Sequence, residues 1–213
     1  MTTIRQDDFI DSVADALQFI SYYHPVDFVQ AVHKAWAMER NPAAKDAMAQ
    51  ILINSRMCAQ GHRPICQDTG IVTVFLRVGM DVRWDATLSV SDMVNEGVRR
   101  AYTHPDNVLR ASILSDPAGA RKNTGDNTPA VIHMELVPGN TVDVRVAAKG
   151  GGSENKSKLV MLNPSDSIVE WVVKTVPTMG AGWCPPGMLG IGIGGTAEKA
   201  AVLAKESLMD PID

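Results

Sequence analysis

The sequence has few of the features that mark nucleic-acid-binding or membrane proteins. Its 213 residues carry 20 Lys and Arg against 24 Asp and Glu, a formal net charge of -4, with no block of basic residues. Nucleic-acid-binding proteins usually present a basic surface, so this balance argues against such a partner. No apolar run reaches the roughly 18 residues of a membrane span. The segment Met1–Asp8 is neither a signal peptide nor an Arg-rich transit peptide, and we expect a cytoplasmic protein.

Cysteine and aromatic residues are also scarce. The count of three cysteines is odd, and without a secretion signal it argues against a disulfide framework. Metal binding or catalysis then becomes the main alternative for an accessible thiol. Aromatic residues make up 5% of the chain, whereas Gly (17) and Met (11) are frequent. This composition favours a site built from backbone loops over one built from stacked rings.

Two of the cysteines lie in segments that are rich in turn-forming residues. Cys66 lies in Pro64–Gly70 and Cys184 in Gly180–Gly187, and both segments contain Gly, Pro and polar residues. A thiol presented from a rigid turn can approach a metal or a substrate. The two are 118 residues apart, which matches neither the local pairs of structural zinc sites nor the tight repeats of ferredoxins. Cys58 ends a helical pattern, and we interpret it as a small core or surface residue.

The pattern of apolar residues predicts helices first and strands afterwards. Helical spacing runs over residues 6–57, with breaks at Pro25 and at Asn41-Pro42. Residues 71–78 form an apolar run typical of a buried strand, and residues 91–102 are expected to be helical. The polar segment Asp116–Pro129 is predicted to be a loop.

The second half of the sequence alternates between strand and helix patterns. Strands are predicted over 130–137 and 141–148, and Pro138-Gly139-Asn140 between them indicates a hairpin. A helix over 166–176, a short strand over 189–193 and a helix over 197–208 follow. The fold class is therefore α/β (mixed α+β), as one domain over residues 1–213. A helical N-terminal layer (1–60) precedes a mixed sheet with flanking helices (61–213).

Three groups are candidates for binding an anion. Gly150, Gly151 and Gly152 follow a predicted strand, and their N–H groups can turn toward one anion, although a flexible strand exit fits the composition as well. Gly192–Thr196 at a predicted helix start gives a weaker signal of the same kind. Arg110 is of interest if a carboxylate needs bidentate binding, and is otherwise a solvated surface residue.

Five motifs occur in an order that resembles one family. The chain resembles the class I, iron–sulfur-dependent fumarate hydratases and the related L-tartrate dehydratase α subunits over nearly its whole length. Each motif alone is modest, but five in order are specific. The motifs are Cys66–Gly70, Asn123–Pro129, Lys149–Lys156, Cys184–Pro186 and Gly194–Glu198.

This resemblance implies a hydro-lyase that carries a [4Fe–4S] cluster and acts on a small dicarboxylate. Cys66 and Cys184 match two of the three cysteines that hold the cluster in the family. Gln67 and Asp68 match residues beside the substrate. Arg110 matches the arginine that binds a substrate carboxylate, and the glycines at 150–152 match a backbone contact to substrate.

The chain also departs from the family pattern. The family's third cysteine comes well after the second, which places the matching position beyond Asp213. Its general base lies in a C-terminal domain or a β subunit, so the catalytic base is not assigned here. We therefore expect an N-terminal portion of a longer enzyme that hydrates fumarate to L-malate or acts on a related dicarboxylate. This portion is expected to be inactive alone and to belong to a homo-oligomer, a homodimer in the family.

Two other hypotheses come from different functional classes. The chain can be a non-catalytic domain without a cluster, whose loops bind an anion or dock a second domain. It can also be a mononuclear zinc or thiol enzyme that uses Cys66.

Overall fold

The chain forms two compact units. The computed structural model describes residues 2–184 and 186–212. One unit covers Met1–Lys149 and the other Gly150–Asp213. The sequence predicted one domain, with a helical layer that ends near residue 60. It did not predict the boundary after Lys149.

Three consecutive helices follow the first few residues of the first unit. They are α1 (Gln6–Tyr22), α2 (Val26–Met38) and α3 (Pro42–Gly61), which confirms the predicted helical region and both breaks. The Asn41 side chain accepts hydrogen bonds from two N–H groups of the first turn of α3, at 3.0 and 3.3 Å. Pro42 occupies the first turn, where a missing N–H costs nothing.

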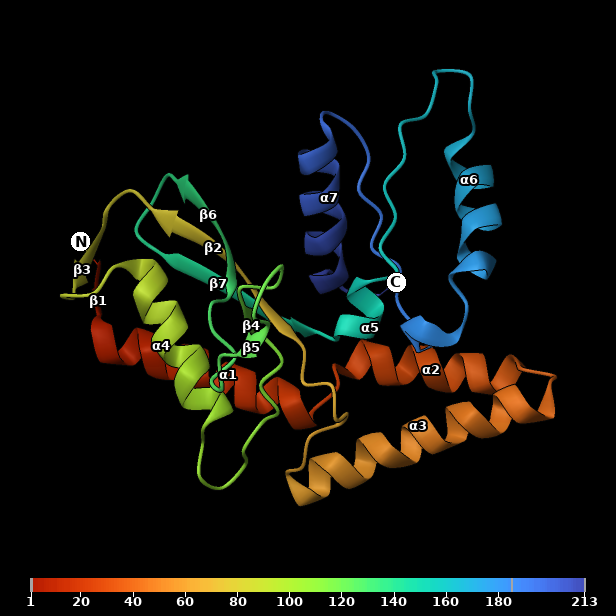
Figure 1. Cartoon of the computed structure of the whole chain (residues 1–213), viewed down its shortest axis with the longest axis horizontal. Helices are drawn as coiled ribbons and strands as arrows, with labels where there is room; N and C mark the ends of the chain where they lie inside the picture. Colours follow the sequence, from red (N-terminus) through yellow and green to blue (C-terminus); the bar gives the residue numbers. More distant parts are fainter. Residues whose placement is uncertain (1, 185, 213) are drawn as a thin grey trace. The chain divides into compact units, whose positions relative to one another are not determined.

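A three-stranded sheet forms the centre of the first unit, in the order β6-β2-β7 (Figure 1). Its strands are β2 (Ile71–Gly79), β6 (Val131–Val137) and β7 (Val142–Lys149). Strand β2 runs parallel to β6 and antiparallel to β7. The predicted hairpin between the last two strands is therefore wrong, since β2 lies between them. Strand β2 is the most apolar of the three, and the central position gives its backbone a partner on each side.

One face of this sheet packs against α1 and α4 (Val90–Tyr102) (Figure 1). Alternate residues of β2 share one face and join the same buried cluster as both helices. Gly97 lets α4 approach α1 closely, because a Cβ there would lie 2.8 Å from Val13 Cβ. The fully buried members of the cluster include Ile10, Val72, Val74, Met93, Val94 and Val98.

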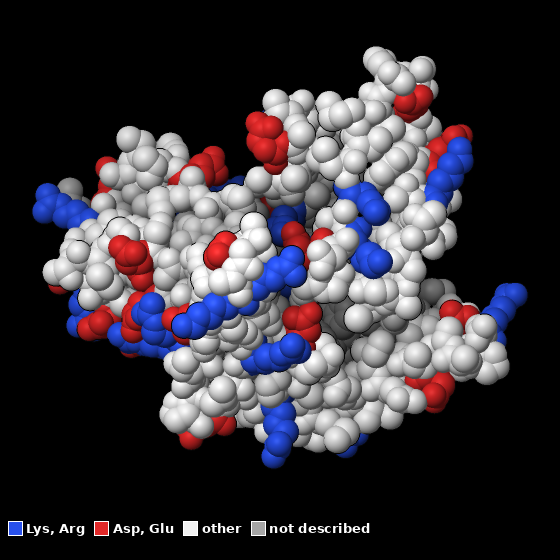
Figure 2. All heavy atoms as spheres, viewed as in Figure 1, with Lys and Arg blue, Asp and Glu red and all other residues white. Residues whose placement is uncertain are grey.

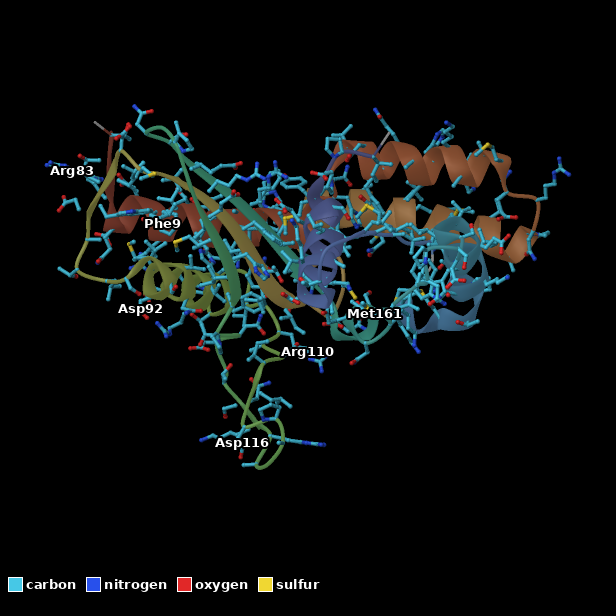
Figure 3. The ribbon with its side chains drawn as sticks, turned by 90° about the horizontal axis from the view of Figure 1, so that it is seen from above. Phe9, Arg83, Asp92, Arg110, Asp116 and Met161 are labelled. Carbon is cyan, nitrogen blue, oxygen red and sulfur yellow. The ribbon has the colours of Figure 1, made fainter. Side chains whose placement is uncertain are left out.

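Two short strand pairs complete the unit. Strand β1 (Thr2–Arg5) pairs in parallel with β3 (Val82–Asp85). Strands β4 (Leu114–Ser115) and β5 (Lys122–Asn123) form a small antiparallel pair, so β5 lies within the segment predicted to be a loop. Asp116 follows β4 and lies near the tip of a projecting segment (Figure 3).

The second unit contains helices and extended segments. Its helices are α5 (Gly151–Glu154), α6 (Ile168–Thr175) and α7 (Ala197–Glu206), with single helical turns at Val176–Met179, Ala181–Trp183 and Ser207–Met209. The predicted helices near 166–176 and 197–208 are confirmed. The strand predicted over 189–193 is wrong, because this segment packs on α7 instead of pairing with a strand. A Cβ at Gly190 or Gly192 would collide with the α7 backbone at Ala204 or Ala200.

The observed elements confirm a mixed α/β fold class. No helix within the described residues is both long and apolar enough to cross a membrane. On the face shown in Figure 2, Lys and Arg atoms are interspersed with Asp and Glu atoms. Ion pairs around α4 include Arg100 with Asp11 at 2.8 Å and with Glu96 at 3.1 Å.

Candidate active site

The loop that carries Cys66 is held at its start by two hydrogen bonds to the backbone of Ile65. It leaves α3 through His62, whose backbone is left-handed with φ 47°. The N–H of Ile65 donates to the Ser21 carbonyl at 2.8 Å, and the Ile65 carbonyl accepts from the Asn54 side chain at 3.0 Å. Both polar groups of the residue before Cys66 are therefore fixed by helices α1 and α3.

The same loop is held at its end by three side chains. The Thr69 hydroxyl donates to the Arg110 carbonyl at 2.5 Å. The Tyr102 hydroxyl contacts the Thr69 carbonyl at 2.6 Å and the Gly70 carbonyl at 3.3 Å. The Asn127 amide donates to the Gly70 carbonyl at 3.0 Å. Loop residues are therefore anchored on both sides of Cys66, Gln67 and Asp68.

Gly70 is the point where the loop enters β2, and a larger residue would not fit there. Its φ is +88°, in the left-handed region that L-residues avoid. A Cβ would lie 2.7 Å from the Ala148 carbonyl carbon and 2.8 Å from the Lys149 nitrogen. These are backbone atoms of β7 and cannot rotate away, so the entry of the loop depends on glycine.

The residues between the anchors face solvent. Cys66 and Gln67 are exposed and Asp68 is half-buried. The Cys66 sulfur accepts the Asp68 N–H at 3.4 Å, and the thiol approaches the Gln67 side-chain oxygen at 3.5 Å. Arg110, which is labelled in Figure 3, is also exposed, and its backbone carbonyl accepts the Thr69 hydroxyl. The structure thus brings the segments of four predicted site residues together within the first unit.

The Asn123–Pro129 motif forms a scaffold beside this loop. Asn127 is fully buried, and its side-chain oxygen accepts the Ser112 N–H at 2.8 Å. Burial alone would raise the pKa of Asp126, but hydrogen bonds from Thr128 and Arg99 outweigh it and hold this pKa below its ordinary value. The motif therefore supports the segment after Arg110.

Cys184 is presented from a turn in the second unit. It follows the turn Ala181–Trp183, and its own backbone is left-handed, with φ 58° and ψ 61°. Its N–H donates to the Ala181 carbonyl at 3.0 Å, and the residue is exposed with a free thiol. Pro185 of the predicted Cys184–Pro186 motif lies outside the described residues. The prediction of a turn-borne thiol is confirmed at both cysteines.

The glycines at 150–152, predicted to turn their N–H groups toward one anion or to form a flexible strand exit, instead begin a helix. Gly150 precedes α5, and Gly151 and Gly152 form its first turn, so their N–H groups are those of a helix start. Position 152 lies against the Cys184 turn, because a Cβ there would be 2.9 Å from the Gly182 carbonyl oxygen. The Lys156 side chain packs against the same Gly182, where a Cβ would be 2.7 Å from its Cε. The glycine motif and the Cys184 turn are thus neighbours.

Other polar groups of the second unit have partners within it. Lys205 on α7 donates to Glu154 on α5 at 2.6 Å. At the start of α7, hydrogen bonds from its own backbone N–H and from Thr196 lower the pKa of Glu198. The Gly192–Thr196 segment, predicted as a weak anion site, therefore already has a carboxylate of its own chain beside it.

The donor atoms fit a cluster in part. Within residues 2–184 and 186–212, no group of three or more His, Cys, Asp or Glu side chains gathers as a metal site. Cys66 and Cys184 are free, exposed thiols, while Cys58 is buried and contacts Asn54 and the Pro64 carbonyl, each at 3.6 Å. Two thiols are therefore suited to binding iron, and the third cysteine packs inside the first unit, as predicted.

Sequence reasoning did not single out Tyr102 or identify the role of Asn127. Tyr102 ends an ordinary amphipathic helix and carries no local motif, so no sequence signal marks it. Asn127 lies in a motif that was noticed, but its partners are distant in sequence. Only the tertiary structure shows that both reach the Cys66 loop.

The Cys66 loop and the Cys184 turn each present an exposed thiol. The exposed Arg110 lies on a segment that is hydrogen-bonded to the Cys66 loop. A sequence model described as "Fumarate hydratase (Fumerase)" matches residues 10–213, and the chain belongs to this family. The match confirms the resemblance inferred from the five motifs. Two curated relatives have related names.

The putative L(+)-tartrate dehydratase subunit alpha of Methanocaldococcus jannaschii is 32% identical over 208 residues, which cover 95% of this chain and 72% of that protein. The L(+)-tartrate dehydratase subunit alpha of Escherichia coli K12 is 28% identical over 204 residues, or 94% of this chain and 66% of that protein. This chain thus spans about two thirds of the length of the second relative.

Proposed function

We propose that the chain is the α-subunit-type part of a hydro-lyase that reversibly hydrates fumarate to L-malate, or acts on a related dicarboxylate such as tartrate. The observation that carries the proposal is the exposed Cys66 thiol, on a loop anchored at both ends, in a chain that matches the family over residues 10–213. The dehydratase names of two relatives support the same reaction class.

In this proposal Arg110, Gln67, Asp68 and the glycines at 150–152 bind the substrate. The guanidinium of Arg110 binds one carboxylate with two parallel hydrogen bonds, which a lysine cannot reproduce. Gln67 and Asp68 orient the reacting end of the substrate beside Cys66. The N–H groups at Gly150–Gly152 contact the substrate through the backbone, since the start of α5 leaves them without helical partners.

Cys66 and Cys184 would hold a [4Fe–4S] cluster through two of its irons. When bound, such a cluster would supply an open iron that acts as a Lewis acid on the substrate hydroxyl. Cys58 does not suit the third position, because it is buried and its sulfur contacts Asn54 and the Pro64 carbonyl. We therefore propose that a further domain or a β subunit supplies the third thiolate and the general base.

Because the third thiolate and the general base come from another domain or subunit in this proposal, the 213-residue chain is predicted to have no turnover of its own. The names of the relatives, which are alpha subunits, support a partner polypeptide. A homo-oligomer of the complete enzyme is part of the same proposal. Robust fumarate hydration or tartrate dehydration by the purified chain would contradict it.

Iron and sulfide bound per chain after anaerobic reconstitution tests the cluster assignment. We expect uptake by the wild type and by the control Cys58→Ala, and loss in Cys66→Ser and in Cys184→Ser. The control removes the buried thiol and leaves both exposed ones. No uptake by the wild type, or equal uptake by all four proteins, would count against the proposal.

A second candidate is a docking domain without a cluster. Many apolar side chains of the second unit are exposed, including Met161 (labelled in Figure 3). The exposed fractions are 77% for Met161, 71% for Val169 and 66% for Val173. Such exposure is typical of a surface that another polypeptide covers. This candidate predicts that a partner binds equally well to wild type and to the Cys66→Ser and Cys184→Ser variants, with no iron in any of them.

A further inference from the structure

The carbonyl of Gly70 is a junction between three parts of the first unit. It accepts hydrogen bonds from Tyr102 at the end of α4, at 3.3 Å, and from Asn127, at 3.0 Å. The exposed fraction of Tyr102 is 1% and that of Asn127 is 0%. Both donors are therefore shielded from water, which cannot easily replace them.

Asn127 also connects this junction to the segment that carries Arg110. Its amide nitrogen donates to Gly70, and its amide oxygen accepts the Ser112 N–H at 2.8 Å. A second link is the Thr69 hydroxyl, which donates to the Arg110 carbonyl at 2.5 Å. The Cys66 loop and the Arg110 segment are thus joined directly and through one buried side chain.

We propose that Tyr102 and Asn127 are positioning residues, which act through the Gly70 and Thr69 backbone to hold Cys66, Gln67 and Asp68 in one frame with Arg110. They touch no reacting atom. The proposal deepens the function proposed above and rests on it for its catalytic meaning. The part of the proposal that concerns the order of the Cys66 loop does not depend on that function and can be tested on this chain alone.

The chemistry of the donors suits this role. Burial raises the pKa of Tyr102 to about 12, and the Asp68 charge contributes in the same direction. The phenol therefore keeps its proton, and remains a donor, over the whole neutral range. Its single proton is shared between two successive carbonyls, with the shorter contact to Thr69. Removing this one oxygen atom weakens the end anchor without changing the shape of the core.

The test measures the mobility of a nitroxide label on Cys66 in the full chain, with Cys58→Ala and Cys184→Ser removing the other thiols. Loss of a net hydrogen bond changes the ratio of mobile to immobile label roughly 2- to 10-fold. We expect Tyr102→Phe to raise this ratio by that factor.

Two controls separate positioning from general destabilisation. Val98→Ala removes fully buried volume from the same helix, one turn before Tyr102, and should leave the Cys66 label unchanged. A label on Cys184, in a background without Cys58 and Cys66, should not respond to Tyr102→Phe. An unchanged Cys66 spectrum in Tyr102→Phe, or an equal change in Val98→Ala, would refute the proposal.

A second variant covers failure of Tyr102→Phe to fold. Thr69→Val keeps the branched shape of the side chain and removes its hydrogen bond to the Arg110 carbonyl. It should therefore also raise the mobility of the label on Cys66. No increase in label mobility in this variant would also refute the proposal. Because the labelled chain needs no iron, failure of iron uptake in the wild type would overturn the proposed function and leave this test standing.

Discussion

The substitution Gly70→Ala tests whether the Cys66 loop depends on close packing against β7. An alanine at φ +88° costs roughly 1–2 kcal/mol from backbone strain. Its Cβ would lie 2.7 Å from the Ala148 carbonyl carbon, which adds roughly 1–3 kcal/mol of overpacking. We therefore expect a loss of about 2–5 kcal/mol in the free energy of unfolding.

Gly125→Ala is the matched control. Gly125 lies in the same unit with φ +83°, and its Cβ would meet no atom within 4 Å. It should lose only the strain of roughly 1–2 kcal/mol. The effect of alanine on the unfolded chain is common to both variants and cancels in the comparison. Urea unfolding followed by circular dichroism measures both, and equal losses would refute the reasoning.

Three further predictions concern thiols, acid and an ion pair. Native alkylation should modify Cys66 and Cys184 and reach Cys58 only after unfolding; mass spectrometry of native protein with a Cys58 adduct would contradict this. The lowered pKa of Asp126 means that its carboxylate stabilises the fold above its unfolded pKa and loses this effect on acidification. Asp126→Asn should therefore be less stable in urea at neutral pH, with the difference shrinking as the pH falls below the ordinary aspartate pKa of about 4. Lys205→Met, which breaks the bond to the α5 glutamate, should cost roughly 0.5–1 kcal/mol and speed hydrogen exchange in α5; unchanged exchange would show that the pair contributes nothing.

Local patterns were sufficient for most helices and for the existence of the strands. Pro25 and Pro42 ended and restarted helices as expected, because proline has no N–H and clashes with a preceding turn. The apolar run of β2 marked a buried strand. The prediction of two turn-borne thiols also held, since Gly and Pro around Cys66 and Cys184 favour turns at short range.

Local patterns failed where a partner came from elsewhere in the chain. Pro138-Gly139-Asn140 reads as a hairpin turn, yet β2 inserts between the strands that it connects. Residues 189–193 have strand composition, but they pack on α7 through two glycines. The glycines at 150–152 form a helix start, because hydrogen bonds to Gly150 and Gly151 carbonyls close a turn there. In each case a packing or pairing choice overrode the local preference.

The sequence by itself determined the family and the fold class, and it marked the candidate site residues. Five motifs indicated the fumarate hydratase family, because their occurrence in this order is specific although each motif alone is modest. The tertiary structure decided what holds these motifs. Tyr102 and Asn127 reach Gly70 from 32 and 57 residues away, and no local pattern encodes such a pairing. Their contacts form only when α4 and the Asn123–Pro129 segment pack beside β2, since burial of the core brings them there.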